Sequence, residues 1–171
     1  MNFKKLLEDR YSVRDYLPQE IDKEIIDYII DCGRLAPSAC NKQPWQFYVV
    51  TSEEGRKAMA ESYPRDWFKE APLNIVICGD HDESWKRSSD NKDHCDVDVS
   101  IAATYMCLAA ESRQLGVCWI CNFNPHLLKA NLNLSENIEP VAILSIGYTN
   151  EVKTKVPQKN RKPVEDFVKW L

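Results

Sequence analysis

The sequence predicts an α+β domain in which helices pack on a central β-sheet. Two observations indicate this class. Segments with helical periodicity alternate with about four apolar runs that are typical of strands. The 171 residues also suffice for one domain with a substantial core, and no repeat or low-complexity segment divides them. We therefore expect residues 1–171 to form a single domain.

The N-terminal elements are two helices separated by a basic loop. Residues 3–7 form a short amphipathic segment, and the loop after it ends at Pro18. Asp22 is placed to cap a helix that runs to about Leu35, because isoleucines recur on one face of that segment. Two prolines with serine and asparagine between them then predict an ordered polar loop over residues 36–44.

Two strands and a helix are expected in the next part of the chain. Trp45–Thr51 is rich in aromatic and β-branched residues, as strands are. The last residue of this strand and Glu54 have the spacing of a capping box, which predicts a helix to about Ser62. After a loop over residues 63–72, the continuous apolar run Leu73–Gly79 is typical of a central strand.

A polar segment and a long apolar helix follow. We interpret residues 81–94 as a surface segment and a candidate lid. Asp98–Leu115 is apolar most of the way round, which predicts a helix buried in the core or in a subunit interface. Gly116 ends this helix, and Val117–Phe123 reads as a strand. Asn124 caps a short helix that has proline at its first position.

The last predicted strand is Val141–Tyr148, and a tail over residues 149–171 follows with several basic residues and an apolar end. No stretch approaches the roughly 20 apolar residues of a membrane span, and the first residues lack a signal sequence. The formal net charge of −4 does not favour nucleic-acid binding. We therefore predict a cytoplasmic protein that binds neither nucleic acid nor membrane.

One short stretch carries the first sign of chemistry, Arg10-Tyr11-Ser12-Val13-Arg14. Arginine suits phosphate recognition because its planar guanidinium is always charged and forms paired hydrogen bonds. An Arg-x-Ser-x-Arg pattern is therefore suited to bind a phosphate and to reach along the rest of the ligand. By itself this pattern is weak, because most short basic clusters are solvated surface.

Three further motifs follow the basic stretch in order. The loop Ala-Pro-Ser-Ala-Cys-Asn-Lys-Gln-Pro-Trp covers residues 36–45. A long apolar helix ends in Leu-Gly and leads into Val-Cys-Trp-Ile-Cys-Asn-Phe. The last strand is followed by Lys159-x-Arg161-x-Pro163. In this order and spacing the chain resembles the FMN-dependent nitroreductase family over nearly its whole length, as a short and compact member.

This resemblance implies a nitroreductase-like fold, with a mostly antiparallel sheet flanked by helices, and an intertwined homodimer that binds FMN at its interface. The tail would pack on the partner subunit. The cofactor-binding positions that it implies are Arg10, Tyr11, Ser12, Arg14, Pro37, Ser38, Ala39, Asn41, Ile120, Cys121, Asn122, Lys159 and Arg161.

Each group of positions has an expected role. Arg10 and Ser12, with Lys159 and Arg161 from the tail, would bind the phosphate and ribityl region of FMN. Arg14 would lie near flavin N1 and O2, where negative charge builds on reduction. The loop that contains Pro37, Ser38, Ala39 and Asn41 would reach FMN from the partner subunit.

The backbone near Cys121 and Asn122 would approach flavin N5. The family often has Glu-Gly at these two positions, so the present sequence departs from it there.

The resemblance also implies a mechanism without a protein acid or base. NADH or NADPH would transfer a hydride to flavin N5, and a nitroaromatic, a quinone or a related acceptor would then take its place, which gives ping-pong kinetics. The aromatic residues expected to line the substrate side are Trp67, Phe68, Trp85 and Phe123.

Two alternatives stay open at this point. One is a flavin store or redox sensor without turnover, and the other is a thiol oxidoreductase that uses Cys118 and Cys121. The seven cysteines are read as thiols, since their number is odd and no secretion signal is present. In a strand, residues i and i+3 point to opposite faces, which disfavours a Cys118–Cys121 bridge. A zinc site there would need two more ligands, and His94 and Cys95 fit no standard spacing, so no metal is predicted.

Overall fold

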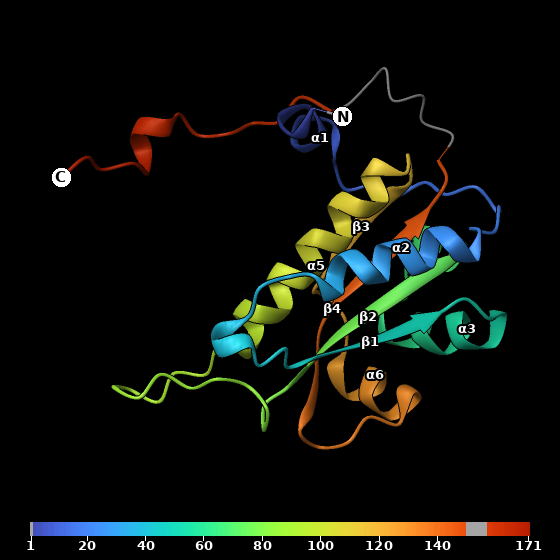
Figure 1. Cartoon of the computed structure of the whole chain (residues 1–171). Coiled ribbons are helices and arrows are strands. Elements are labelled where there is room, and N and C mark those ends of the chain that lie inside the picture. Colours follow the sequence, from blue (N-terminus) through green and yellow to red (C-terminus); the bar gives the residue numbers. More distant parts are fainter. Residues whose placement is uncertain (1, 150–156) are drawn as a thin grey trace.

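The structure, a computed structural model, describes residues 2–149 and 157–171, so residues 150–156 of the predicted tail lie outside the described residues. One sheet has the strand order β1-β2-β4-β3, and every neighbouring pair is antiparallel (Figure 1). The strands are β1 (Trp45–Val50), β2 (Leu73–Asp80), β3 (Gly116–Ile120) and β4 (Ile138–Gly147). The α+β class predicted from the sequence is confirmed.

Helices cover both faces of this sheet. The helices of the described residues are α1 (Phe3–Asp9), α2 (Lys23–Arg34), α3 (Glu53–Ser62), α4 (Asp66–Glu70), α5 (Cys95–Ser112) and α6 (Pro125–Leu132), with 3-10 turns η1 (Ala39–Asn41) and η3 (Val164–Asp166). The helices α2 and α5 contact each other and cover one face of the sheet, whereas α3, α4 and α6 pack on the other face (Figure 1).

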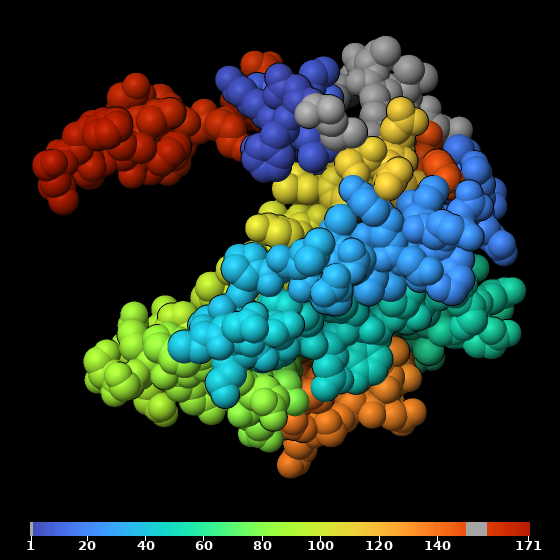
Figure 2. Space-filling view, in the orientation of Figure 1, coloured from blue at the N-terminus to red at the C-terminus, as the bar shows by residue number. Residues whose placement is uncertain are grey.

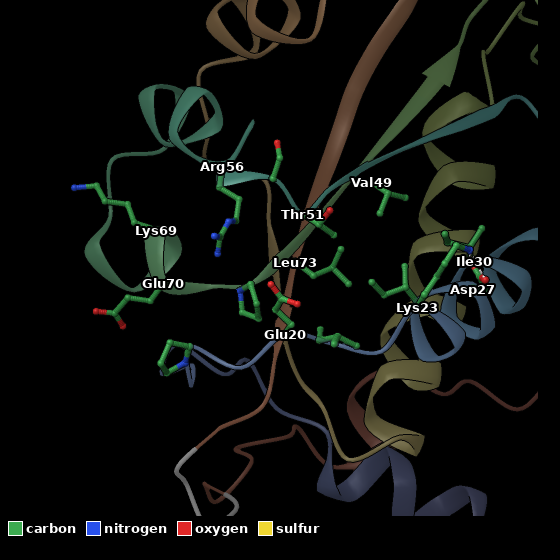
Figure 3. A pocket seen from close by; sticks show the side chains of 15 residues that line it. Glu20, Lys23, Asp27, Ile30, Val49, Thr51, Arg56, Lys69, Glu70 and Leu73 are labelled. Carbon is green, nitrogen blue, oxygen red and sulfur yellow. Dashed lines mark hydrogen bonds and ion pairs between the residues drawn. The ribbon is translucent and has the colours of Figure 1, made fainter. Parts of the chain in front are cut away.

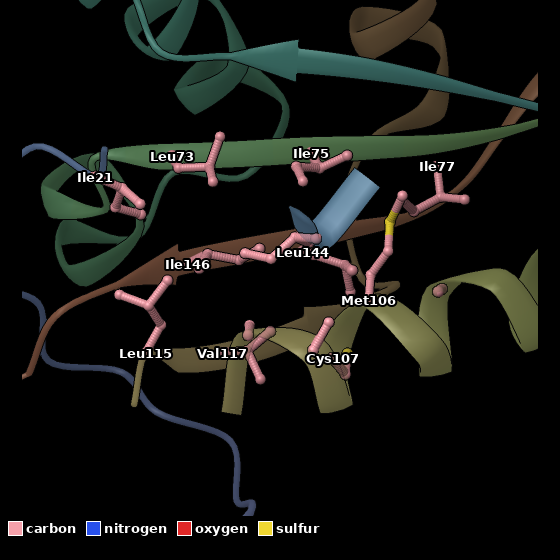
Figure 4. Packing of buried hydrophobic residues seen from close by; sticks show 14 of the residues in the cluster. Ile21, Leu73, Ile75, Ile77, Met106, Cys107, Leu115, Val117, Leu144 and Ile146 are labelled. Carbon is pink, nitrogen blue, oxygen red and sulfur yellow. The ribbon is translucent and has the colours of Figure 1, made fainter. Parts of the chain in front are cut away.

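The central strand β2 explains why helices are needed on both faces. Leu73, Ile75 and Ile77 alternate along it and pack into the cluster with α5, where Met106 also lies (Figure 4). Val76 belongs to the cluster on the opposite face. All of these side chains are at most 1% exposed. Burying each one stabilises the fold by about 1.5–3 kcal/mol. Because side chains alternate between the two faces of a strand, β2 is buried on both sides.

Contact between α2 and α5 depends on a small residue. Gly33 is buried in the last turns of α2, and a Cβ atom built there would overlap the Met106 side chain of α5. The absence of a side chain therefore lets the two helices approach closely. This contact positions α5 across the sheet.

Two predictions in the first half were wrong in detail. Ser52, and not Thr51, caps α3, because its hydroxyl accepts a hydrogen bond from the Gly55 N–H at 3.1 Å. Residues 63–72 were expected to form a loop but contain α4, a helix of only five residues. Such a short helix has little periodicity to detect, and it is stabilised here by Phe68, which is 1% exposed.

Boundaries in the second half also differ from prediction. The long helix begins at Cys95, three residues before the expected start, and β3 ends at Ile120. The cap at Asn124 is confirmed, since its side chain accepts hydrogen bonds from two backbone N–H groups at 3.1 and 3.2 Å. The expected surface segment, residues 81–94, contains one isolated bridge between Lys86 and Asp93.

Candidate functional site

The Arg-x-Ser-x-Arg stretch is held against the edge of the sheet. Ser12 forms an isolated parallel bridge with Val117 of β3, and the Val13 N–H donates to the Val117 carbonyl at 3.2 Å. The Tyr16 hydroxyl is buried and lies 2.9 Å from the Ser145 carbonyl of β4. These contacts fix the chain on both sides of Arg14.

Lys159 of the tail joins this N-terminal region. Its Nζ donates to the Leu7 carbonyl at 2.6 Å, across 152 residues of sequence. Burial lowers the pKa of Lys159, and the charges of Arg10 and Arg161 lower it further, while Glu111 and Asp9 act in the opposite direction. The charges of two other predicted phosphate ligands therefore disfavour the protonated form of Lys159, an effect that a multiply charged anion bound there would offset.

Arg14 has different surroundings from Arg10. Its side chain is exposed, one guanidinium nitrogen lies 3.5 Å from the Ser12 carbonyl, and its guanidinium carbon lies 5.9 Å from the centre of the Trp67 ring. Tyr11 and Ser12 are half-buried between the two arginines. The five-residue stretch thus presents a cation at each end.

The loop over residues 36–44 has an unusual backbone. Cys40, Asn41 and Gln43 have φ values of 50°, 55° and 51°, a region that residues other than glycine seldom adopt. The Ser38 hydroxyl accepts a hydrogen bond from the Gln43 N–H at 2.9 Å. Among the remaining predicted positions, Pro37 and Asn41 are exposed and Ala39 is half-buried.

Asp98 holds this loop and was not identified from the sequence. It is only 2% exposed, and its Oδ1 accepts a hydrogen bond from the Ala39 N–H at 3.0 Å. Its Oδ2 is buried and has no hydrogen-bond partner among the described residues. The available signal was a carboxylate within the most apolar helix of the chain, since a buried charge requires a specific contact.

The two groups of predicted residues lie near opposite ends of α5. The loop is bound at Asp98. Further along the helix, the charge of Arg10 opposes the burial that raises the pKa of Cys107, and the charge of Glu111 opposes the burial that lowers the pKa of Lys159. These points are about 14–20 Å apart along a helix. In Figure 1, η1 accordingly lies at one end of α5, and α1 with the tail lies at the other. A single chain does not bring its loop against its own cation cluster.

The strand β3 contains one buried cysteine, and an exposed cysteine follows directly after it. Ile120 is 4% exposed and Cys118 is 1% exposed, whereas Cys121 and Asn122 are exposed. The Trp119 indole N–H donates to the Cys121 sulfur at 3.0 Å. Burial raises the pKa of the Cys118 thiol. All seven cysteines are free thiols, as predicted.

The four aromatic residues expected on the substrate side lie in different surroundings. Phe68 is in the core, so its predicted role is wrong. Trp67 and Phe123 are half-buried against the same core cluster, and Trp85 packs on His94 with ring centres 4.9 Å apart. Aromatic character alone did not distinguish core residues from lining residues.

A pocket of about 840 Å³ lies between α2, the end of β1 and α4 (Figure 3). Its walls combine apolar side chains such as Val49 and Leu73 with charged ones such as Arg56 and Glu70. None of the predicted cofactor-binding residues lines it. The proposed chemistry therefore does not depend on this pocket.

Comparison with known proteins decides the family. The sequence matches the nitroreductase family over residues 7–65 and 62–148. The chain belongs to the nitroreductase family. The crystal structure of a nitroreductase family protein from Clostridium difficile 630 superposes with a TM-score of 0.91 at 34% identity, covering 99% of this chain and 98% of that chain.

Two other members of the nitroreductase family are similar over most of their length. A protein of Archaeoglobus fulgidus, assigned as an NADH dehydrogenase/NAD(P)H nitroreductase, is 32% identical over 154 residues, which are 87% of this chain and 86% of the relative. An FMN-dependent nitroreductase of Clostridium difficile R20291 has a TM-score of 0.76 at 29% identity, covering 94% of this chain and 92% of that one. The nitroreductase fold predicted from the sequence is thus confirmed.

Within the described part of this nitroreductase, none of the helices is both long and apolar enough to cross a membrane.

Proposed function

We propose that this protein is an FMN-dependent oxidoreductase that takes a hydride from NADH or NADPH and passes it to a nitroaromatic, a quinone or a related acceptor. The observation that carries the proposal is the contact between the two ends of the chain, where Lys159 of the tail donates a hydrogen bond to Leu7 and the charges of Arg10 and Arg161 act on it. The name of the Archaeoglobus relative includes NAD(P)H nitroreductase, and that of the second Clostridium difficile protein includes FMN.

The residues present fit the phosphate end of FMN. A phosphate dianion needs more than one cation, and Lys159 lies where the charges of both Arg10 and Arg161 act on it. The Ser12 hydroxyl, which lies on the same backbone segment, is suited to the ribityl region. Removing Lys159 from water already lowers its pKa, so an anion bound there would stabilise its protonated form.

Arg14 is suited to the opposite end of the cofactor. When bound, FMN supplies a hydride acceptor at N5 and develops negative charge at N1 and O2. Arg14 has no carboxylate partner among the described ion pairs, so its charge is available for that position. The Trp67 ring lies beside the guanidinium, at a distance that allows a cation–π contact. The protein thereby orients the cofactor and stabilises charge without a protein acid or base.

A homodimer would complete the site. The loop at η1 and the cation cluster are separated along α5, so the loop of a second subunit is the segment proposed to cover the cofactor. An apolar stripe on α5 supports this arrangement, since Val97 is 48% exposed and Tyr105 is 41% exposed. The tail supports it as well, because Phe167 is 66% exposed and Trp170 is 94% exposed, and Figure 2 shows this segment standing away from the body. We propose that the tail packs on the partner subunit.

Anaerobic reduction tests the proposal. The purified protein, loaded with FMN, is mixed with NADH or NADPH, and the visible flavin absorption is followed. We expect either nicotinamide to bleach the band, and a nitroaromatic or quinone to restore it. Initial rates at several concentrations of both substrates should give parallel double-reciprocal lines, as ping-pong kinetics requires.

The same experiment addresses the alternative of a flavin store. A store would bind FMN with the same cations but would keep its colour when NADH and NADPH are added. Binding without bleaching by either nicotinamide would therefore contradict the proposed turnover while leaving the cofactor assignment intact.

A further inference from the structure

A set of metal-ligand side chains lies outside the proposed flavin site. His81 follows β2, Asp93 ends the 81–94 segment, and Cys95 is the first residue of α5. One ligand atom from each, an imidazole nitrogen, a carboxylate oxygen and a sulfur, lies within 4.8 Å of the others. The fold thus brings three different ligand types together at the point where the 81–94 segment leaves and rejoins the domain.

The histidine is oriented from both sides. Its Nδ1 lies 3.0 Å from Asp93 Oδ2, and its Nε2 lies 2.8 Å from Glu139 Oε2 of β4. A histidine that binds a metal through one nitrogen commonly donates its other N–H to a carboxylate, which fixes the tautomer and the ring orientation. Glu139 is in position to play this supporting role.

Hydrogen bonds to one of its two carboxylate oxygens orient Asp93. Oδ1 of Asp93 accepts hydrogen bonds from the Ser84 hydroxyl and from the Cys95 N–H, each at 2.7 Å. Burial raises the pKa of Asp93, but hydrogen bonds from His81, the Cys95 N–H and Ser84 more than offset this and lower it to about 2. The carboxylate is therefore ionised, and Oδ2 faces the imidazole.

Cys95 supplies the third candidate ligand from the buried side of this cluster. Cys95 is 1% exposed, and its sulfur packs against Gly79 of β2, where a Cβ atom would overlap it. The absence of a side chain at position 79 thus makes room for this sulfur next to the end of β2.

We propose that His81 Nδ1, Asp93 Oδ2 and Cys95 Sγ form a three-ligand zinc site, with Glu139 and Ser84 as supporting residues. Mixed nitrogen, oxygen and thiolate ligands match the preferences of Zn²⁺. Zinc bond lengths place neighbouring tetrahedral ligand atoms about 3.4–3.6 Å apart, so small movements from the present spacing suffice. A fourth position is left for water, because the side chains of His81 and Asp93 are 34% and 30% exposed.

Proton release accompanies binding. Cysteine binds zinc as a thiolate, so the Cys95 thiol gives up its proton when the metal binds. Zinc replaces that proton on forming the Zn–S bond, and the proton passes to solvent. No oxidation or reduction is involved.

A bound zinc would connect three parts of the fold. It would join β2, the end of the 81–94 segment and the first turn of α5. Asp98, which holds the 36–44 loop, lies one turn further along the same helix. Zinc would therefore stiffen the support of that loop while leaving the cation cluster at the other end of α5 unchanged.

Zinc titration of the full-length protein tests this site. Protein stripped with a chelator is titrated with zinc chloride by calorimetry, with and without FMN. We expect one zinc per chain, with affinity reduced at least about tenfold in His81→Gln and in Asp93→Asn. His94→Gln and Asp90→Asn are matched controls in the same segment and should bind as the unchanged protein does.

Cobalt reports on the sulfur ligand. Co²⁺ bound at this site should show a thiolate charge-transfer band, which Cys95→Ser should remove and Cys32→Ser should preserve. Should Cys95→Ser fail to fold, His81→Gln, a half-exposed position, still decides the question. Binding well below one zinc per chain, or binding unaffected by His81→Gln and Asp93→Asn, would show that these residues form a hydrogen-bonded cluster only and would overturn the proposal.

Discussion

Arg10 and Arg14 are four residues apart but have different chemical surroundings. The charge of Arg10 acts on Lys159 of the tail, whereas Arg14 is exposed beside the Trp67 ring. The sequence motif predicted both as cofactor ligands, because guanidinium groups suit phosphate and developing charge alike. It did not show that Lys159 reaches Leu7 across 152 residues of sequence, since no local pattern reports that contact.

Replacement of Arg14 tests the role at the redox end. Arg14→Ala should slow flavin reduction by NADPH by roughly 100-fold, because one charged donor to developing negative charge is lost. It should leave the preference for FMN over riboflavin nearly unchanged, since Arg14 is not placed near the phosphate. Stopped-flow reduction and flavin titration measure the two effects. A loss of phosphate preference with normal reduction would reverse the assignments of Arg10 and Arg14.

Cys118 allows a test against the thiol alternative. It is buried with a raised pKa, unlike the reactive cysteines of dithiol enzymes, whose pKa is lowered. Cys118→Ala should lower the free energy of unfolding by about 1–2 kcal/mol but keep NAD(P)H oxidation within about twofold once FMN is bound. Urea unfolding and steady-state rates measure these quantities. Abolished turnover in a folded, FMN-bound variant would support thiol chemistry instead.

At the scale of helices and strands, strong periodicity was informative and short elements were not. The four strands and the helices α2, α3, α5 and α6 were predicted with boundary errors of a few residues. The helix α4 was missed because five residues show no repeat, and its stability comes from tertiary packing of Phe68. The start of α5 was placed late because Cys95 and Asp96 belong by composition to the polar segment before them.

The loop at η1 was predicted, but the contact that holds it was not. A buried carboxylate in α5 accepts from the loop backbone, and this contact spans 59 residues. In the sequence, Asp98 is the first residue of the predicted helix, where aspartate is common as a cap and predicts no distant contact. The group that Asp98 contacts depends on how α5 and the loop pack together, and this packing is a property of the assembled fold.

Substitution at Asp98 should free this loop. In Asp98→Ala the Ala39 N–H loses its acceptor, whose charge-assisted hydrogen bond contributes about 1.5–3 kcal/mol. We expect the exchange of the Ala39 amide hydrogen to accelerate by at least about tenfold, as measured by NMR. Asp96→Ala, an exposed neighbour in the same turn, serves as the control. Equal protection of Ala39 in both variants would mean that other contacts hold the loop.

For the whole molecule, the two chain ends meet although they are far apart in the sequence. The Lys159–Leu7 hydrogen bond connects the tail to α1, and the apolar residues after it extend away from the domain (Figure 2). The sequence predicted the tail's cations through family resemblance and not through physical pattern. The dimer that we propose accounts for the exposed apolar side chains on the tail and on α5.

Shortening the tail tests that dimer. Removal of residues 164–171 keeps Lys159 and Arg161 but deletes Phe167 and Trp170. We expect the dimer dissociation constant to rise by at least about 100-fold, because burial of these two large side chains contributes several kcal/mol. Analytical ultracentrifugation over a range of concentrations measures it. A dimer of unchanged affinity, or a monomeric full-length protein, would contradict the proposed role of the tail.

The central claim is that cations from both chain ends bind the phosphate of FMN. The most direct measurement compares FMN with riboflavin, which lacks the phosphate, in titrations of the apoprotein. The full-length protein should prefer FMN strongly, and Arg10→Ala, Lys159→Ala and Arg161→Ala should each reduce that preference by roughly thirtyfold, or about 2 kcal/mol. Lys57→Ala, which removes an equal charge from α3, should not change it. Equal affinity for FMN and riboflavin, or a preference unaffected by all three substitutions, would contradict the account.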